Sequence, residues 1–144
     1  MMPKFKVWDK KTKSMWNIER WHVEDEYFDL IEPNKSVADP NANRVWRKQN
    51  EVILMQSTGV YDKHGVEIFE GNIIQQVHAY DYSILEIETD FLEPFEVKKG
   101  NYVQGKWIAE KIDGENYSVV RYVFGKDVKV IGNVHQHPEL LEDV

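Results

Sequence analysis

The sequence predicts a mostly β fold, and three observations support this prediction. Aromatic residues are abundant, with five Trp, seven Tyr and six Phe in 144 residues, and such side chains favour strands over helices. No long stretch keeps the apolar period of 3.6 residues that an amphipathic helix requires. Short apolar segments instead alternate with turn clusters roughly every ten residues, a spacing typical of small barrels and sandwiches.

The first expected element is a β-hairpin over residues 4–18. Its two strands flank the polar turn DKKTK at residues 9–13. Residues 20–31 mix aromatic and acidic side chains, which predicts one or two short strands interrupted near residues 24–25. The amino-terminal region is therefore expected to be built from hairpins.

A loop is expected over residues 32–43, which hold two prolines, three asparagines and few large apolar side chains. Such a segment buries too little apolar area to offset the conformational entropy lost on ordering. We therefore expect it to be exposed, and to serve as a linker or a mobile insertion. Residues 44–50 then lead into the centre of the chain.

The central stretch, residues 51–77, carries the clearest turn signal. Residues 52–55 are continuously apolar, which suits a strand buried on both faces, and Gly59 is expected to end that strand. The cluster DKHG at residues 62–65 predicts a hairpin loop in which Gly65 has a positive φ.

The second half of the chain is expected to continue as strands separated by Gly-containing turns, and to close with one short helix. Pro138 suits the first position of that helix because its fixed φ is already helical. The expected strands and helix occupy residues 73–77, 84–88, 117–124, 128–134 and 139–143.

Three motifs, at the two ends and the centre, resemble those of one known family. They are FKVWDKKTKSM at residues 5–15, MQSTG, DKHG and IFEGNI within residues 55–73, and VIGNV followed by PELL within residues 130–141. Their order and content resemble the YopX-like proteins, a phage- and prophage-encoded family. Asn72 stands where that family commonly has Asp, so a role that needs a carboxylate there would be absent.

The resemblance implies a β-rich fold with an SH3-like barrel in the carboxy-terminal half, and it supplies no catalytic or ligand-binding residues. Joined to the pattern of turns, it predicts an N-terminal β-rich region over residues 1–70. The SH3-like barrel with its short C-terminal helix would then span residues 71–144.

Composition excludes several functional classes. The chain has no cysteine, which excludes disulfide scaffolds, thiolate metal sites and thiol chemistry. No apolar run approaches the ~20 residues needed to span a bilayer, and we expect a cytoplasmic protein of the host cell. A net charge of −7 disfavours indiscriminate binding to nucleic acid, whose affinity comes from neutralised phosphates.

Catalytic signals are sparse. Ser57, Thr58 and Gly59 follow an apolar run, but we expect their hydroxyls to satisfy the backbone at a bend rather than to act as nucleophiles. His135 and His137 would share a strand face as a minimal metal pair, although solvated histidines are the better interpretation. We expect no cofactor and no structural metal, and whether the protein is an enzyme stays open, with a non-enzymatic role favoured.

Basic residues interleaved with aromatic ones are the more informative signal. Such pairs suit stacking and cation contacts with single-stranded nucleic acid, or a protein interface rich in Trp. The competing interpretation is a core or edge Trp with lysines extended beside it. The candidate interaction residues are Trp46, Arg47, Lys99, Tyr102 and Trp107.

The leading functional hypothesis is a phage or prophage accessory protein that acts through protein contacts, with self-association into a homo-oligomer expected as one form. A nucleic-acid-binding module is the alternative. A metal-dependent hydrolase comes third, because its carboxylate clusters, such as Glu86 with Glu88, are expected by chance in a chain with 25 acidic residues.

Overall fold

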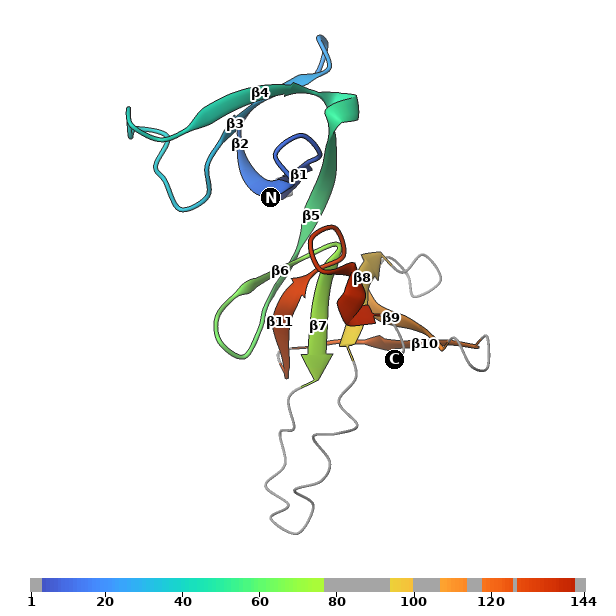
Figure 1. Ribbon diagram of the computed structural model, residues 1–144. Coiled ribbons are helices and arrows are strands. Elements are labelled where there is room, and N and C mark those ends of the chain that lie inside the picture. The colour runs from blue at the N-terminus through green and yellow to red at the C-terminus, as the bar shows by residue number, and fades with distance from the viewer. Residues whose placement is uncertain (1–3, 77–93, 100–106, 114–117, 126, 142–144) are drawn as a thin grey trace. The chain divides into compact units, whose positions relative to one another are not determined.

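The computed structural model describes residues 4–76, 94–99, 107–113, 118–125 and 127–141 (Figure 1). Within these ranges the regular elements are strands and two short 3-10 turns, so the predicted mostly β class is confirmed. The strand expected over residues 84–88 lies outside the described residues. The elements are β1 (Phe5–Asp9), β2 (Ser14–His22), β3 (Tyr27–Ile31), β4 (Arg44–Lys48), η1 (Gln49–Glu51), β5 (Val52–Tyr61), β6 (Glu67–Phe69), β7 (Asn72–Gln76), β8 (Pro94–Lys99), β9 (Trp107–Asp113), β10 (Ser118–Val123), β11 (Val128–Asn133) and η4 (Pro138–Leu141).

The chain divides into two compact units, Met1–Ser57 and Thr58–Val144. The division falls inside β5, whereas the sequence led us to expect it after residue 70. The residues that change unit are 58–70, which form the second half of β5 and the whole of β6. Ile68 of β6 is fully buried in the core of the second unit, and this burial assigns the hairpin to that unit.

The first sheet has the strand order β4-β3-β2-β1-β5-β6, and the first half of β5 pairs with β1. β1 and β2 form the predicted hairpin, and β2 pairs with β3 across the predicted interruption. In this sheet β4 is an edge strand that runs through η1 directly into β5 (Figure 1). The buried residues of this unit's core are Val7, Trp16, Phe28, Leu30 and Val52.

Gly59 does not end its strand, and that expectation was wrong. β5 continues to Tyr61, with Gly59 at φ 76°, a conformation in the left-handed region that Gly adopts without a Cβ clash. The hydroxyl of Thr58 donates to the Ile68 carbonyl at 2.8 Å and accepts from the Val60 N–H at 3.1 Å. This confirms, for Thr58, the expected structural role of the hydroxyl at the bend.

The turn between β5 and β6 forms around Asp62, as the DKHG signal predicts. Its carboxylate accepts from the N–H groups of His64 and Val66, each at 2.8 Å, and Gly65 has the expected positive φ of 81°. The second carboxylate oxygen accepts from the Val130 N–H at 2.9 Å. One side chain therefore closes the turn and ties it to β11.

Burial disfavours the ionised form of Asp62, but hydrogen bonds to the carboxylate outweigh that penalty. The backbone N–H groups of Val130, Val66 and His64 favour the charged form, and they hold the pKa of Asp62 below its ordinary value. The turn is thus stabilised by an ionised, nearly buried carboxylate.

The second sheet has the strand order β10-β9-β8-β7-β11, and all its pairs are antiparallel. β10 and β11 stand at its two edges, and no pairing among the described residues closes the sheet into a barrel. Its buried core consists of Ile68, Ile74, Val97, Ala109, Phe124 and Val128.

Two asparagines stabilise turns next to strands of this sheet, one before β7 and one after β11. Asn72 Oδ1 accepts from the Phe69 N–H at 2.7 Å, a bond that an amide oxygen makes as readily as a carboxylate. Asn133 Oδ1 accepts from the N–H groups of His135 and Gln136 after β11. Asn72 therefore stabilises the turn between β6 and β7 through its amide oxygen.

Of the helix expected over residues 139–143, the described part belongs to a 3-10 turn, Pro138–Leu141, in which the Leu140 N–H bonds to the His137 carbonyl at 3.1 Å. So short a segment gains too few hydrogen bonds to propagate as an α-helix. No helix in the described ranges is long and apolar enough to cross a membrane.

Candidate interaction site on strands β3 and β4

Strand alternation gives β3 and β4 one buried and one outward face. Phe28 and Leu30 are fully buried in the first unit's core, and Val45 packs against it. The antiparallel register places Tyr27 opposite Lys48 and Asp29 opposite Trp46 on the other face. Exposed side chains from two strands are thereby brought together where β4 forms the sheet edge.

Three rings line up across this outward face. The His22 ring stacks on the Tyr27 ring with centroids 4.0 Å apart, and the Tyr27 and Trp46 rings meet edge to face at 6.1 Å. His22 is opposite Tyr27 because a register shift between Ile18 and Arg20 in β2 precedes it. Trp46 ends the row and keeps 60% of its surface exposed.

Acidic side chains surround the rings. The Asp29 carboxylate lies 2.8 Å from His22 Nε2, which fixes both side chains in place. An open hollow of about 420 Å³ is lined by Asp25, Tyr27, Asp29, Trp46 and Lys48. A second hollow of about 390 Å³ shares Asp25 and Lys48 with it and adds Glu26, Gln49 and Asn50.

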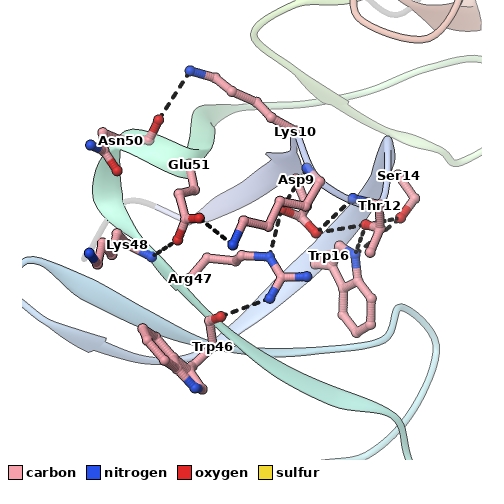
Figure 2. A network of polar contacts seen from close by, with 11 residues as sticks. Asp9, Lys10, Thr12, Ser14, Trp16, Trp46, Arg47, Lys48, Asn50 and Glu51 are labelled. Atoms are coloured by element: carbon pink, nitrogen blue, oxygen red, sulfur yellow. Dashed lines mark hydrogen bonds and ion pairs between the residues drawn. The ribbon is translucent and has the colours of Figure 1, made fainter.

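The opposite face of β4 holds a polar network instead (Figure 2). Arg47 Nε donates to Asp9 Oδ1 at 3.0 Å, and the Asp9 side chain has no exposed surface. The same carboxylate accepts from the Thr12 hydroxyl at 2.7 Å, which in turn accepts from the Trp16 indole N–H at 2.9 Å. Arg47, a predicted interaction residue, therefore stabilises the fold through Asp9.

Burial disfavours the charged form of Asp9, yet its pKa lies below the ordinary value. The Thr12 hydroxyl, the Arg47 guanidinium and the N–H groups of Lys11 and Thr12 favour the carboxylate more strongly than burial disfavours it. The Asp9 carboxylate is fully buried and hydrogen-bonded, and the Arg47 side chain keeps 16% of its surface exposed. Removing either partner would leave the other uncompensated.

The two lysines that follow Asp9 complete this network. Lys10 Nζ donates to the Asn50 carbonyl at 3.2 Å, and Lys11 Nζ lies 2.6 Å from Glu51. The DKKT segment of the family-like motif therefore joins the β1–β2 turn to η1. These residues make structural contacts, and they identify no ligand site.

The side chain of Arg44, at the start of β4, is also held by contacts within the first unit. Its guanidinium pairs with Glu19 at 3.1 Å and donates to the carbonyls of Asp39 and Val37 at 2.9 and 2.8 Å. These bonds fasten the loop over residues 32–43, which is largely exposed, as predicted. Of the cations on β4, Lys48 is the one that lines the hollow beside Trp46.

The other sequence-predicted interaction residues lie in the second unit. Lys99 is exposed at the end of β8, opposite Trp107 in β9, and Trp107 packs partly buried against the core. Tyr102 lies outside the described residues. The five predicted residues therefore do not form one cluster within a unit.

The predicted histidine pair belongs to the turn after β11. The Asn133 N–H reaches His137 Nδ1 at 3.4 Å, and the His137 ring lies against Gly132, where a Cβ would approach within 2.6 Å. Burial lowers the pKa of His135. Among the residues that the structure describes, no three His, Cys, Asp or Glu side chains are grouped to hold a metal ion.

Two carboxylates lie side by side on β8 and β9, among the described residues. Glu96 is directly opposite Glu110, and Lys98 lies 4.0 and 2.9 Å from them. Burial, together with the negative charges of Glu110 and Glu70, raises the pKa of Glu96, while Lys98 opposes the shift. The lysine thus compensates two like charges across a strand pair.

Sequence reasoning identified Trp46 but missed Asp25, Tyr27, Asp29 and His22. The position of Trp46 two residues before Lys48 is the one signal for this face in the sequence, because alternate residues of a strand share a face. The residues contributed by β2 and β3 required knowledge of the strand register, including the shift in β2, which periodicity alone does not supply.

Comparison with known proteins supports the resemblance found in the motifs. The sequence profile of the YopX protein family matches residues 4–142. A solved structure, that of protein EF1440 from Enterococcus faecalis, is similar with a TM-score of 0.59 and 25% identity over 99% of both chains. A search of curated proteins found no match. Because the match spans nearly the whole chain and its motif residues form the turns described above, this protein belongs to the YopX family.

Proposed function

We propose that this chain is a non-enzymatic protein-interaction module, encoded by a phage or prophage, that binds its partner through the outward face of β3 and β4. The single observation that carries the proposal is the 60% exposed indole of Trp46 beside an open hollow on an edge strand. Exposed aromatic side chains next to a hollow are characteristic of the anchors that dominate binding energy at protein interfaces.

The alternative, a nucleic-acid-binding surface, has less support from the same face. Arg44 and Arg47 are held by Glu19 and Asp9, so neither guanidinium is presented for phosphate contacts. Asp25 and Asp29 line the hollow and would repel a phosphate backbone, as would the net charge of −7. The balance of charge around Trp46 therefore favours a protein partner, including a second copy of the chain.

For the second unit we retain, as part of this proposal, the SH3-like barrel that the family resemblance implies. Its support is a sheet of five antiparallel strands with β10 and β11 as the two edges that a barrel would bring together.

The test compares Trp46→Ala with Val23→Ala, a matched control in which another exposed apolar side chain of the same unit is removed. Light scattering measures the mass of each variant, and affinity capture from host cells followed by mass spectrometry identifies what each retains. We expect the control to keep the wild-type oligomer or partner and Trp46→Ala to lose it.

Two outcomes would contradict the proposal. One is a partner or oligomer that both variants retain equally. The other is tight binding of labelled single-stranded DNA by a monomer at physiological salt, because such binding would assign the surface to nucleic acid.

A further inference from the structure

We infer that the hollow beside Trp46 binds a positively charged side chain, an arginine or lysine, of the protein partner. This inference rests on the proposed function and specifies the chemistry of the partner. The hollow combines two features that favour cations, aromatic rings and carboxylates, within the first unit.

The aromatic part is formed by Tyr27 and Trp46. Their ring planes meet at 79°, so the hollow borders rings with two different orientations. The face of an aromatic ring is electron-rich and attracts a cation, and Trp does so most strongly. The His22 ring, which comes from β2, stacks almost parallel to the Tyr27 ring, with the two planes 10° apart. The Tyr27 ring is therefore held between β2 and β4.

The carboxylates add a charge of matching sign. Asp25 and Asp29 both line the hollow, and the contact between Asp29 and His22 fixes one of them in position. Glu26 lines the adjoining hollow, which shares Asp25. A guanidinium or ammonium group placed against Trp46 would therefore be close to carboxylates, whereas a phosphate or a partner's carboxylate would be repelled.

Lys48 provides the internal check on this assignment. It is the cation that lines the hollow, and it lies opposite Tyr27 in the strand register. If the occupant is a cation, Lys48 opposes binding, and its removal should strengthen the interaction. If the occupant is an anion, Lys48 is its main attraction, and its removal should weaken binding.

The probe is a blocked pentapeptide, acetyl-Gly-Arg-Gly-Arg-Gly-amide, compared with the same peptide carrying citrulline, a neutral isostere of arginine. Binding to the full chain is followed by the NMR shift of the Trp46 indole N–H, which Trp46→Phe assigns. We expect the arginine peptide to move this signal in a saturable manner. The citrulline peptide should need at least a tenfold higher concentration.

Variants that change the charge of the hollow then determine whether the group that binds there is a cation or an anion. Asp25→Asn should weaken binding of the arginine peptide about threefold or more, and Lys48→Gln should strengthen it by a similar factor. Glu24→Gln is the matched control, because it changes the net charge by the same amount at an exposed neighbour of Asp25 outside both hollows. It should leave the affinity within twofold.

The inference is overturned if the citrulline peptide binds as well as the arginine peptide, if Lys48→Gln weakens binding, or if Glu24→Gln acts as strongly as Asp25→Asn. It is also overturned if oligothymidylate or an acidic peptide moves the Trp46 signal at lower concentration. Partner capture that depends on Trp46 but is unchanged in Asp25→Asn and Lys48→Gln would refute the cation assignment and leave the proposed function standing. Peptide binding as expected, with capture indifferent to Trp46→Ala, would refute the proposed function and leave standing the preference of the hollow for cations.

Discussion

Two turns, one in each unit, each begin with a buried Asp, and the two Asp side chains have different partners. Asp9 begins the turn between β1 and β2, and Asp62 begins the turn between β5 and β6, and both carboxylates are almost completely buried. Asp9 compensates the Arg47 cation from β4, whereas Asp62 accepts hydrogen bonds from three backbone N–H groups. Both carboxylates also accept from N–H groups of their own turn, those of Lys11 and Thr12 in the case of Asp9, so the difference between them is the Arg47 cation that Asp9 compensates.

The turns also differ in how they accommodate a left-handed residue. Lys13 closes the first turn with φ 54°, and Gly65 closes the second with φ 81°. A residue with a Cβ is strained in this region and Gly is not. The first turn therefore holds a residue with a Cβ in the left-handed region, whereas the second turn avoids that strain by using Gly.

The largest effect is expected for Asp9→Asn, because it removes the fully buried carboxylate that pairs with the mostly shielded Arg47 guanidinium. We expect a loss of about 3 kcal/mol in the free energy of unfolding of the first unit. Denaturant unfolding followed by Trp fluorescence measures it, since four of the five Trp, at positions 8, 16, 21 and 46, lie in this unit. A loss below about 1 kcal/mol would show that the ion pair contributes little.

Asp62→Asn should cost less, about 2 kcal/mol, because no cation is left unpaired. The amide keeps one acceptor oxygen, but its NH₂ group replaces the oxygen that accepts from Val130 or the one that accepts from His64 and Val66. At least one part-buried backbone donor therefore loses its partner. Circular dichroism during denaturant unfolding reports this change. An effect equal to that of Asp9→Asn would remove the distinction between the two turns.

Acidification should destabilise the protein through both carboxylates. The pKa values of Asp9 and Asp62 in the folded chain are below their ordinary value of 3.8. As the pH falls, the unfolded chain therefore binds protons at these two carboxylates before the folded chain does. Their stabilisation is complete above about pH 4 to 5 and is lost as the pH falls through the lower folded-state values. The loss between pH 5 and 3 should be smaller in Asp9→Asn and in Asp62→Asn than in the wild type, and equal losses in all three would contradict this assignment.

Gly65→Ala should lower the free energy of unfolding by about 1 kcal/mol, because Ala is strained at a positive φ. Space is not the cause, since a Cβ at Gly65 would meet no atom within 4 Å. Gly125→Ala is the control, being equally open but without a positive φ. Equal melting temperatures for the two variants would show that backbone strain does not govern this turn.

The smallest expected effect is an increase in the free energy of unfolding. Lys13→Gly should raise the stability by about 0.5 kcal/mol, because relief of strain at φ 54° exceeds the added entropy of the unfolded chain. The change is read from the same fluorescence transition as for Asp9→Asn. A destabilisation would mean that the Lys13 side chain makes a contribution larger than the strain.

Several features of this protein were determined by local sequence alone. The β class, the hairpin at residues 4–18, the hairpin loop at residues 62–65, the exposed loop at residues 32–43 and the positive φ of Gly65 all depend on residues close together in the chain. Apolar alternation and turn chemistry act over a few residues, so they can be recognised without the fold. The three motifs likewise sufficed to indicate the YopX family, because each is a short contiguous run of residues.

Tertiary structure decided what the local pattern left open. Gly59 continues a strand because Thr58 bonds to Ile68 across the hairpin, and Arg47 is structural because β1 brings Asp9 beneath β4. The candidate site depends on strand register, since one shifted residue in β2 decides whether His22 meets Tyr27 beside Trp46. A sequence window shows neither the register shift in β2 nor the pairing of β4 with β3, so the composition of this surface could be known only from the folded chain.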